Sequence, residues 1–237
     1  MFTGIVAAVG AIEAVHPIEA AGAAKEAGVR LVIEAAALGL DDVGLGDSIA
    51  IAGACMTVVE LGGRAASPLP TGRFAVDVSR ESLAKTVGLS APGAVNLEKS
   101  LRLLDRLGGH LVSGHVDGLG RVAEFVAVGE SWRLAIDVPG ALAGFVAYKG
   151  SVTVNGVSLT VNSVDDSPAE PTLEGRVSRI AINVIPHTMA VTTLGRLQVG
   201  DFVNLEVDQI ARYCERLLSL RFGAAVNHRH ELGEPDR

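Results

Sequence analysis

The chain has 237 residues, of which 49% are hydrophobic, 20% are charged and 4% are aromatic, and this balance excludes the low-hydrophobicity, high-charge composition of disordered proteins. The formal net charge of −7 and the pI of about 5.4 show none of the basic excess that nucleic-acid binders carry, so we expect no nucleic-acid partner. Two cysteines are too few for a disulfide framework, and the sequence has neither a basic leader nor an uncharged apolar run of ~18 residues, so we expect a reduced, cytoplasmic protein without a membrane span.

The first half of the chain has the pattern of an all-β domain. Short runs rich in β-branched and apolar side chains predict strands at residues 30–34, 73–78 and 94–98. Residues 62–72, which include two prolines, predict a loop, and helical turns are expected at residues 20–27 and 79–86. Several short strands with little helix favour a small closed barrel or a sandwich.

The second half has the same character. Strands are expected at residues 133–138, 151–154, 157–161 and 179–184. Asn155 and Gly156 form the strongest short hairpin signal, and Ala52 and Gly53 hold the equivalent place in the first half. Residues 118–123 have the glycine spacing of a dinucleotide fingerprint, but no crossover helix follows them. We therefore expect a β-turn there, and a helical turn at residues 139–148.

Sequence blocks of the first half return in the second half in the same order. The paired blocks are residues 2–6 with 112–116, residues 51–58 with 154–161, and residues 95–98 with 203–206, of which the last pair is identical (Val-Asn-Leu-Glu). Matches in one order predict two homologous domains. We place the boundary at Gly108–Gly109, which gives domains at residues 1–109 and 110–207.

The end of the chain changes to a helical period. Ile210, Tyr213, Leu217 and Leu220 have the spacing of a heptad seam within residues 208–222. Two heptads fit either a helix that caps a barrel or a helix that joins subunits. Residues 223–237 are expected to form a flexible tail.

Polar side chains alternate with apolar ones along the predicted hairpins. Ser158 and Thr160 share one strand face, and Cys55 and Thr57 share the matching face in the first half. Each residue alone fits a solvent-facing strand, but the recurrence of the pattern favours a ligand face.

Two histidines, His110 and His115, lie at the start of the second domain. In a strand they would point to opposite faces, and no cluster of cysteine or glutamate accompanies them, so we expect no metal site. A single histidine near hydroxyl groups fits either an acid/base group or a structural side chain.

Several motifs together resemble the riboflavin synthases of the α-subunit type, over residues 1–221. They are Met-Phe-Thr-Gly-Ile-Val at residues 1–6, Gly-His-Leu-Val-Ser-Gly-His-Val at 109–116, Gly-Val-Ser-Leu-Thr-Val at 156–161 and Ile-Pro-His-Thr at 185–188. The resemblance implies two six-stranded antiparallel β-barrels, followed by a helix that forms a homotrimer.

The resemblance also implies a reaction, the last step of riboflavin biosynthesis. One molecule of 6,7-dimethyl-8-ribityllumazine donates a four-carbon unit to a second, which gives riboflavin and 5-amino-6-ribitylaminouracil without a metal or redox cofactor. The active site would form where the N-terminal barrel of one subunit meets the C-terminal barrel of its neighbour. The sequence leaves an association with lumazine synthase open.

The same resemblance assigns site residues. For the N-terminal pocket they are Gly4, Ile5, Val6, Ser48, Cys55, Met56, Thr57, Asp77, Val78, Ser79, Arg80, Glu81 and Ser82. For the C-terminal pocket they are Gly114, His115, Val116, Lys149, Ser158, Leu159, Thr160, Asn183, Val184, Ile185, Pro186, His187 and Thr188. Phe2 would cover the ligand's ring and Asp208 would lie near the ribityl chain, while Ser48, Cys55 and His115 correspond to the family's catalytic side chains.

Two other functions fit the same motifs. A non-catalytic lumazine- or flavin-binding homologue would have the same barrels, but the retention of Ser48, Cys55 and His115 counts against it. A flavin-dependent oxidoreductase would need a nicotinamide-binding α/β domain, and no βαβ pattern follows the barrels.

Overall fold

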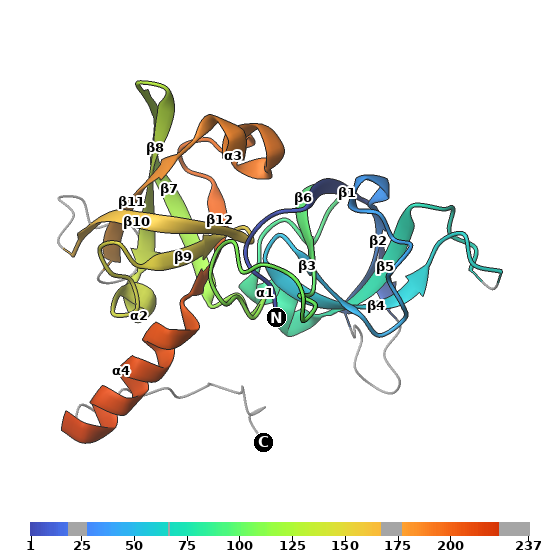
Figure 1. Ribbon diagram of the computed structural model, residues 1–237, viewed down its shortest axis with the longest axis horizontal. Helices are drawn as coiled ribbons and strands as arrows, with labels where there is room; N and C mark the ends of the chain where they lie inside the picture. Colours follow the sequence, from blue (N-terminus) through green and yellow to red (C-terminus); the bar gives the residue numbers. More distant parts are fainter. Residues whose placement is uncertain (19–27, 66, 167–176, 223–237) are drawn as a thin grey trace, which may run out of the picture.

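Two barrels lie side by side in the computed structural model, which describes residues 1–18, 28–65, 67–166 and 177–222 (Figure 1). Within these residues the strands form two closed six-stranded antiparallel barrels. The expected fold is therefore confirmed. The helical turn predicted at residues 20–27 and the tail predicted at 223–237 lie outside the described residues.

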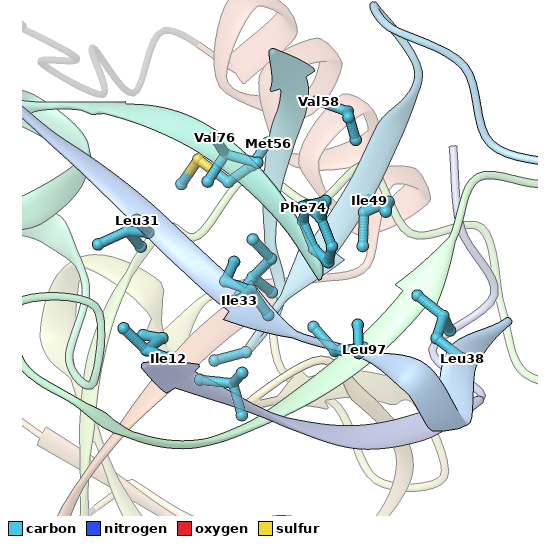
Figure 2. Packing of buried hydrophobic residues seen from close by; sticks show 14 of the residues in the cluster. Ile12, Leu31, Ile33, Leu38, Ile49, Met56, Val58, Phe74, Val76 and Leu97 are labelled. Carbon is cyan, nitrogen blue, oxygen red and sulfur yellow. The ribbon is translucent and has the colours of Figure 1, made fainter. Parts of the chain in front are cut away.

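Barrel 1 follows the order β1-β2-β5-β4-β3-β6. Its elements are β1 Ala8–Ile18, β2 Gly28–Glu34, a 3-10 turn Ala36–Leu38, β3 Ser48–Ile51, β4 Ala54–Leu61, β5 Arg73–Ser79, α1 Arg80–Lys85 and β6 Gly93–Lys99. Alternate side chains point inward, so Ile12, Leu31, Ile33, Phe74 and Leu97 fill the interior (Figure 2).

Barrel 2 repeats this order, since β7-β8-β11-β10-β9-β12 follows the same circuit. Its elements are β7 Gly118–Val128, β8 Ser131–Pro139, α2 Gly140–Ala143, β9 Ser151–Val154, β10 Val157–Asp165, β11 Val177–Val184, α3 Pro186–Val191, a 3-10 turn Thr193–Arg196 and β12 Phe202–Val207. Every strand predicted from the sequence lies within one of these elements or coincides with it, because alternating apolar residues suit a barrel wall.

The β-turn expected at residues 118–123 is wrong, because these residues lie inside β7. Gly120 faces the packed interior, where a Cβ would lie 2.6 Å from Ile136 Cγ2 and 2.7 Å from Leu205 Cδ1. The equivalent Gly10 of β1 also has no room for a side chain, because a Cβ there would lie 2.5 Å from Leu97 Cδ1. These glycines provide space for neighbouring side chains instead of a turn.

The barrels meet at two hairpin turns. Ala52 and Asn155 both have φ of 48°, and Gly53 and Gly156 follow with φ of 87° and 81°, which is the left-handed pattern of a two-residue hairpin. A Cβ on Gly53 would lie 2.7 Å from the Gly156 nitrogen, and one on Gly156 would lie 2.8 Å from the Gly53 nitrogen. The turns therefore pack directly on each other.

Two asparagines of the repeated Val-Asn-Leu-Glu block tie the barrels together. Asn96 of β6 donates from Nδ2 to the Asn155 carbonyl at 2.9 Å. Asn204 of β12 donates from Nδ2 to the carbonyls of Ala52 at 3.0 Å and Val87 at 3.1 Å. Both amides are almost fully buried, so these bonds supply the partners that burial requires.

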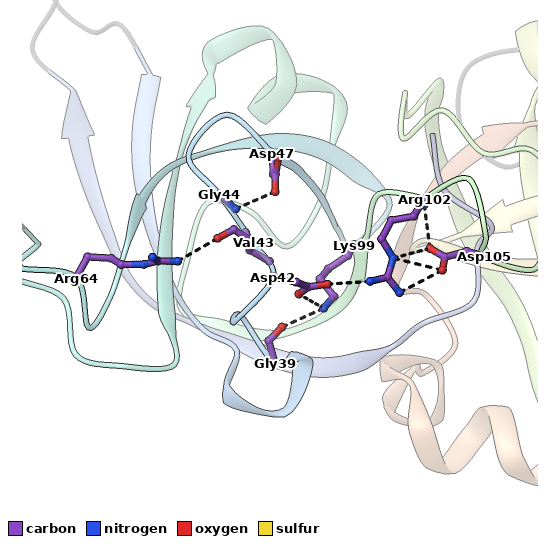
Figure 3. Close-up of polar contacts among 9 residues, drawn as sticks. All are labelled: Gly39, Asp42, Val43, Gly44, Asp47, Arg64, Lys99, Arg102 and Asp105. Carbon is purple, nitrogen blue, oxygen red and sulfur yellow. Dashed lines mark hydrogen bonds and ion pairs between the residues drawn. The ribbon is translucent and has the colours of Figure 1, made fainter.

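The chain that joins the barrels starts from a surface network on barrel 1 (Figure 3). Asp42 accepts from Lys99 Nζ at 2.7 Å and lies 3.3 Å from Arg102, which also pairs with Asp105 at 3.2 Å. Exposed pairs each contribute under ~1 kcal/mol, so the network orients the connection more than it stabilises it.

The terminal helix α4, Gln209–Phe222, projects away from barrel 2 (Figure 1). Asp208 starts it by accepting from the Ile210 amide at 2.8 Å. Ile210, Tyr213, Leu217 and Leu220 are each more than 60% exposed, so the helix does not cap a barrel with its apolar seam. In the described part of the chain, no helix has the length and hydropathy to span a membrane.

Candidate active site

Two segments cross between the barrels, near the chain start drawn at the middle of Figure 1. We call residues 1–7 the N-terminal segment and residues 110–117 the connecting segment. They run antiparallel and exchange two backbone hydrogen bonds, from Phe2 N to Val112 O at 2.7 Å and from Val112 N to Phe2 O at 3.1 Å. The repeated blocks thus lie against each other.

The N-terminal segment, which precedes barrel 1 in the chain, binds a hairpin of barrel 2, and the connecting segment, which precedes barrel 2, binds a hairpin of barrel 1. Cys55 of β4 donates its amide to the Gly114 carbonyl at 2.7 Å, and Ser158 of β10 donates its amide to the Gly4 carbonyl at 2.7 Å. The two contacts are equivalent under the repeat.

The expected grouping of the segments is therefore wrong. Val6 packs against the core of barrel 2 and Val116 against the core of barrel 1, although we expected residues 4–6 at barrel 1 and residues 114–116 at barrel 2. Because the two repeats carry the same motifs, a segment looks equally compatible with either barrel in the sequence.

Gly114 is expected to tolerate no side chain. Its φ is +79°, and a Cβ would lie 2.6 Å from Cys55 Cβ. We expect Gly114→Ala to lower the free energy of unfolding by about 1–3 kcal/mol or more, measured by urea denaturation. Gly46→Ala is the control, because Gly46 has φ of +89° with nothing within 4 Å of the Cβ position. Equal losses in both variants would mean that the close approach to Cys55 costs nothing.

Barrel 1 has a pocket of about 280 Å³ between β4, α1 and the connecting segment. It is lined by Ala54, Cys55, Met56, Glu81, Ser82, Lys85, Thr86, Gly114, His115 and Val116. The structure thus brings seven predicted site residues together and adds Ala54, Lys85 and Thr86. Lys85 could have been found from its i,i+4 spacing to Glu81, with which it forms an ion pair of 2.7 Å.

Other residues predicted for barrel 1 lie outside this pocket. Ser48 and Thr57 are cross-strand partners on the outer face of β3 and β4. Asp77 binds Arg30 through both carboxylate oxygens, at 2.7 and 2.9 Å, and this hydrogen bonding lowers the pKa of Asp77. Its carboxylate is therefore occupied by a surface ion pair.

The residues after Asp77 build the start of α1. Val78 is buried in the core, and Arg80 is the exposed first residue of the helix. Ser79 caps the helix by accepting from the Ser82 amide at 3.1 Å. These residues fix the start of α1, and with it the position of Ser82 in the pocket lining.

Phe2 has no exposed surface and packs against Ala50, Val112 and Cys55. The side chain lies inside this cluster in the single chain, and the expectation that it covers a ligand's ring stays a prediction. Ile5 of the same segment is half exposed.

Barrel 2 places a histidine beside Ser158. His110 Nδ1 lies 2.7 Å from Ser158 Oγ, and its Nε2 lies 3.5 Å from Thr153 Oγ1. Burial lowers the pKa of His110, and the charge of Asp208 opposes that shift only in part, so the ring is neutral near neutral pH. The two histidines thus serve different barrels. His110 was absent from the predicted set because the compared repeat block starts two residues later.

The remaining residues predicted for barrel 2 differ in exposure and in their contacts. Exposed Lys149 donates to Asn162 Oδ1 at 3.1 Å, and exposed Asn183 accepts from Ser131 Oγ at 2.7 Å. Leu159 is half buried, Thr160 is exposed and Val184 is fully buried, while Ile185 precedes α3 and Pro186, His187 and Thr188 form its first turn.

Two buried glutamates hold the crossing segments. Glu206 of β12 accepts from the amides of Ser113 at 2.7 Å and Gly114 at 2.9 Å. Desolvation raises the pKa of Glu206 to about 7, helped by the nearby charge of Asp117. Desolvation also raises the pKa of Glu98, its equivalent on β6.

The raised pKa predicts a fall in stability with rising pH. Glu206 stays protonated in the folded chain up to about pH 7, whereas an unfolded chain releases this proton near the ordinary glutamate pKa of 4.5. Between these values the folded state binds more protons, so the free energy of unfolding falls as pH rises. We expect Glu206→Gln to remove about 1–3 kcal/mol of this fall between pH 4.5 and 7.5, measured by urea denaturation across that range. An unchanged slope in the variant would contradict the assignment.

Both repeats match a family described as the lumazine binding domain, over residues 3–100 and 113–208. A riboflavin synthase of Photobacterium phosphoreum is 39% identical over 220 residues, which cover 92% of this chain and 89% of that protein. The riboflavin synthase of Brucella abortus (strain 2308) is 39% identical over 219 residues, with 92% and 98% covered. That of Mycobacterium bovis is 42% identical over 180 residues, with 75% and 82% covered.

Solved structures share the fold. The crystal structure of LumP complexed with riboflavin superposes with a TM-score of 0.68 at 23% identity and covers 87% of this chain and 99% of its own. LumP complexed with 6,7-dimethyl-8-(1'-D-ribityl) lumazine gives a TM-score of 0.65 at 22% identity, with the same coverage. At this identity the likeness bears on the architecture.

Proposed function

The chain belongs to the riboflavin synthase family, whose lumazine-binding domain it carries twice, and we infer that it is a transferase that converts two molecules of 6,7-dimethyl-8-ribityllumazine into riboflavin and 5-amino-6-ribitylaminouracil. One molecule gives a four-carbon unit to the other, so carbon balances without an external donor. The reaction needs no metal or redox cofactor.

The observation that carries this function is a pair of equivalent half-sites with unlike side chains. Under the repeat, Cys55 corresponds to Ser158 and His115 to Ile5. His115 lines the barrel 1 pocket with Cys55, whereas Ser158 has His110 at 2.7 Å. Because the two substrate molecules are identical, only a difference between the pockets can make one a donor and the other an acceptor.

The proposed chemistry asks little of the protein. The 7-methyl protons of the lumazine are acidic because the resulting anion delocalises into the ring. Holding two rings face to face then supplies much of the rate through effective concentration. In this proposal His115 moves a proton at the barrel 1 half-site, where Cys55 is the neighbouring polar group. Ser48 corresponds to a catalytic side chain of the family but lies outside the pocket of the single chain, so no step is assigned to it.

We propose that the complete active site joins barrel 1 of one subunit to barrel 2 of a neighbour in a homotrimer assembled through α4. The exposed apolar seam of Ile210, Tyr213, Leu217 and Leu220 supports this assembly. The proposed division of the chain is residues 1–109, 110–207 and 208–222.

The two cysteines, Cys55 and Cys214, are both free, which supports a reduced compartment such as the cytoplasm. An association with lumazine synthase is part of the same proposal.

The test is incubation of the purified protein with 6,7-dimethyl-8-ribityllumazine. We expect the absorbance and fluorescence of riboflavin to grow, with one riboflavin formed for every two lumazines consumed. Quenching of lumazine fluorescence without riboflavin formation would show instead a non-catalytic lumazine- or flavin-binding homologue.

A further inference from the structure

Two glutamates at equivalent places of the repeat bind the two crossing segments. Glu98 accepts from the Thr3 amide at 2.7 Å, from Thr3 Oγ1 at 2.7 Å and from the Gly4 amide at 2.9 Å. Glu206 accepts from the amides of Ser113 at 2.7 Å and Gly114 at 2.9 Å. Both side chains are less than 10% exposed. The same arrangement therefore occurs twice.

Burial of a carboxyl group costs free energy unless hydrogen bonds compensate for the lost water. Each glutamate lies on the outer face of its barrel, where Glu98 pairs across strands with Ala50 and Glu206 with Thr153. The barrel interiors are filled by other side chains. These carboxyl groups consequently contribute nothing to core packing, and their contacts are to the crossing segments.

The backbone of each segment is shaped to bind a carboxyl group, and it binds the ionised form most strongly. Gly4 and Gly114 have φ of +74° and +79°, and each glycine turns its own amide and the preceding amide toward one carboxyl group. Successive amides in such a turn form an anion-binding nest. The glutamate of the last barrel strand occupies that nest.

Each glycine is held from both sides. The amide of Gly114 binds Glu206 of barrel 2, and its carbonyl accepts from Cys55 of barrel 1 at 2.7 Å. The amide of Gly4 binds Glu98 of barrel 1, and its carbonyl accepts from Ser158 of barrel 2 at 2.7 Å. The residue after Gly114 is His115, so this clamp fixes the peptide that carries it.

We propose that Glu206 is a positioning residue for the barrel 1 half-site, because it holds the peptide that carries His115 beside Cys55. Glu98 in the same way holds the Gly4 peptide beside Ser158. This inference rests on the proposed function, because Glu206 acts through His115.

The test is a double-mutant cycle between Glu206→Gln and His115→Ala. Glutamine has the same shape but replaces one acceptor oxygen with an NH2 group, which faces an amide donor. We expect Glu206→Gln to lower kcat about 10- to 100-fold with at most a small change in KM, since small misplacements of a reacting group have effects of this size. In the His115→Ala background the same change should lower kcat no further. If Glu206→Gln lowers kcat by the same factor in the wild-type and in the His115→Ala background, the proposal is overturned.

Glu98→Gln is the matched control, because it releases the other segment. Glu98→Gln should lower kcat by the same factor in the wild-type and in the His115→Ala background. If it instead loses its effect in the His115→Ala background, the two clamps are not separate and the assignment fails. Should Glu206→Gln not fold, Glu206→Asp, which keeps the charge but shortens the reach, enters the same cycle.

Amide hydrogen exchange tests the clamp without turnover. The amides of Ser113 and Gly114 should exchange faster in Glu206→Gln, and those of Thr3 and Gly4 should not. A wild-type protein that makes no riboflavin would refute the proposed function, whereas unchanged exchange at Ser113 and Gly114 would refute the clamp.

Discussion

His115→Ala is expected to lower kcat by about 10²–10⁴-fold, the range typical of a lost acid/base group, while lumazine affinity changes far less. His115 is exposed at the barrel 1 pocket, beside Cys55 and Ser82. The equivalent residue of the other segment is Ile5, so the half-sites differ at this position. Single-turnover riboflavin formation gives the rate, and titration of lumazine fluorescence gives the affinity.

Cys55→Ser is the matched comparison in the same pocket. The repeat already has serine at the equivalent position, Ser158, whose backbone makes the same 2.7 Å contact to a segment glycine. We expect a milder loss than for His115→Ala. Near-normal turnover in the histidine variant would remove His115 from the mechanism, and a larger loss in the cysteine variant would shift the main role to Cys55.

Leu217→Glu is expected to abolish most synthase activity by breaking the assembly of subunits. Leu217 is 67% exposed on the seam of α4 and belongs to neither barrel core among the residues that the structure describes, so a charge there leaves the barrels intact. In a seam between three helices the same charge would be buried, which is strongly unfavourable. Light scattering should show a lower mass, and circular dichroism should show intact β structure.

Two further variants sharpen this experiment. Leu218→Glu makes the same change one residue off the heptad seam, where Leu218 is 55% exposed, and should leave both mass and activity unchanged. Truncation after Val207 should resemble Leu217→Glu, although it also removes the Arg212 to Asp117 ion pair of 2.6 Å. A truncated protein that stays trimeric, or a fully active monomer, would refute both the helix seam and the shared active site.

The local sequence was enough to predict the two hairpin turns, α4 and seven of the strands, whereas β1, β7 and β12 were not predicted. Asn155 with Gly156 predicts its turn because both residues accept positive φ, and the same turn forms at Ala52 with Gly53. The order of repeated blocks predicted two homologous domains, since similar sequences form similar folds, and the family resemblance implied that both are barrels. These features depend on residues close in the chain or on comparison of its halves, which the sequence contains in full.

The pairing of segments with barrels required the tertiary structure. Gly4 and Gly114 lie in matching motifs, so their sequences cannot show that each crosses to the opposite barrel, where Ser158 and Cys55 bind them. Likewise, Gly120 has the local signature of a turn, but only the closed barrel shows the side chains that exclude a Cβ there.

His110 also required the tertiary structure. His110 lies outside the compared repeat block, so the comparison of the two halves could not indicate it. It becomes a candidate site residue because its Nδ1 lies 2.7 Å from Oγ of Ser158, which is far away in the sequence. Most strands and the duplication could be read from the chain, because propensity and periodicity are local and the repeated blocks can be compared directly. The contacts between distant residues could not, because they depend on how the two barrels close and how the segments cross between them.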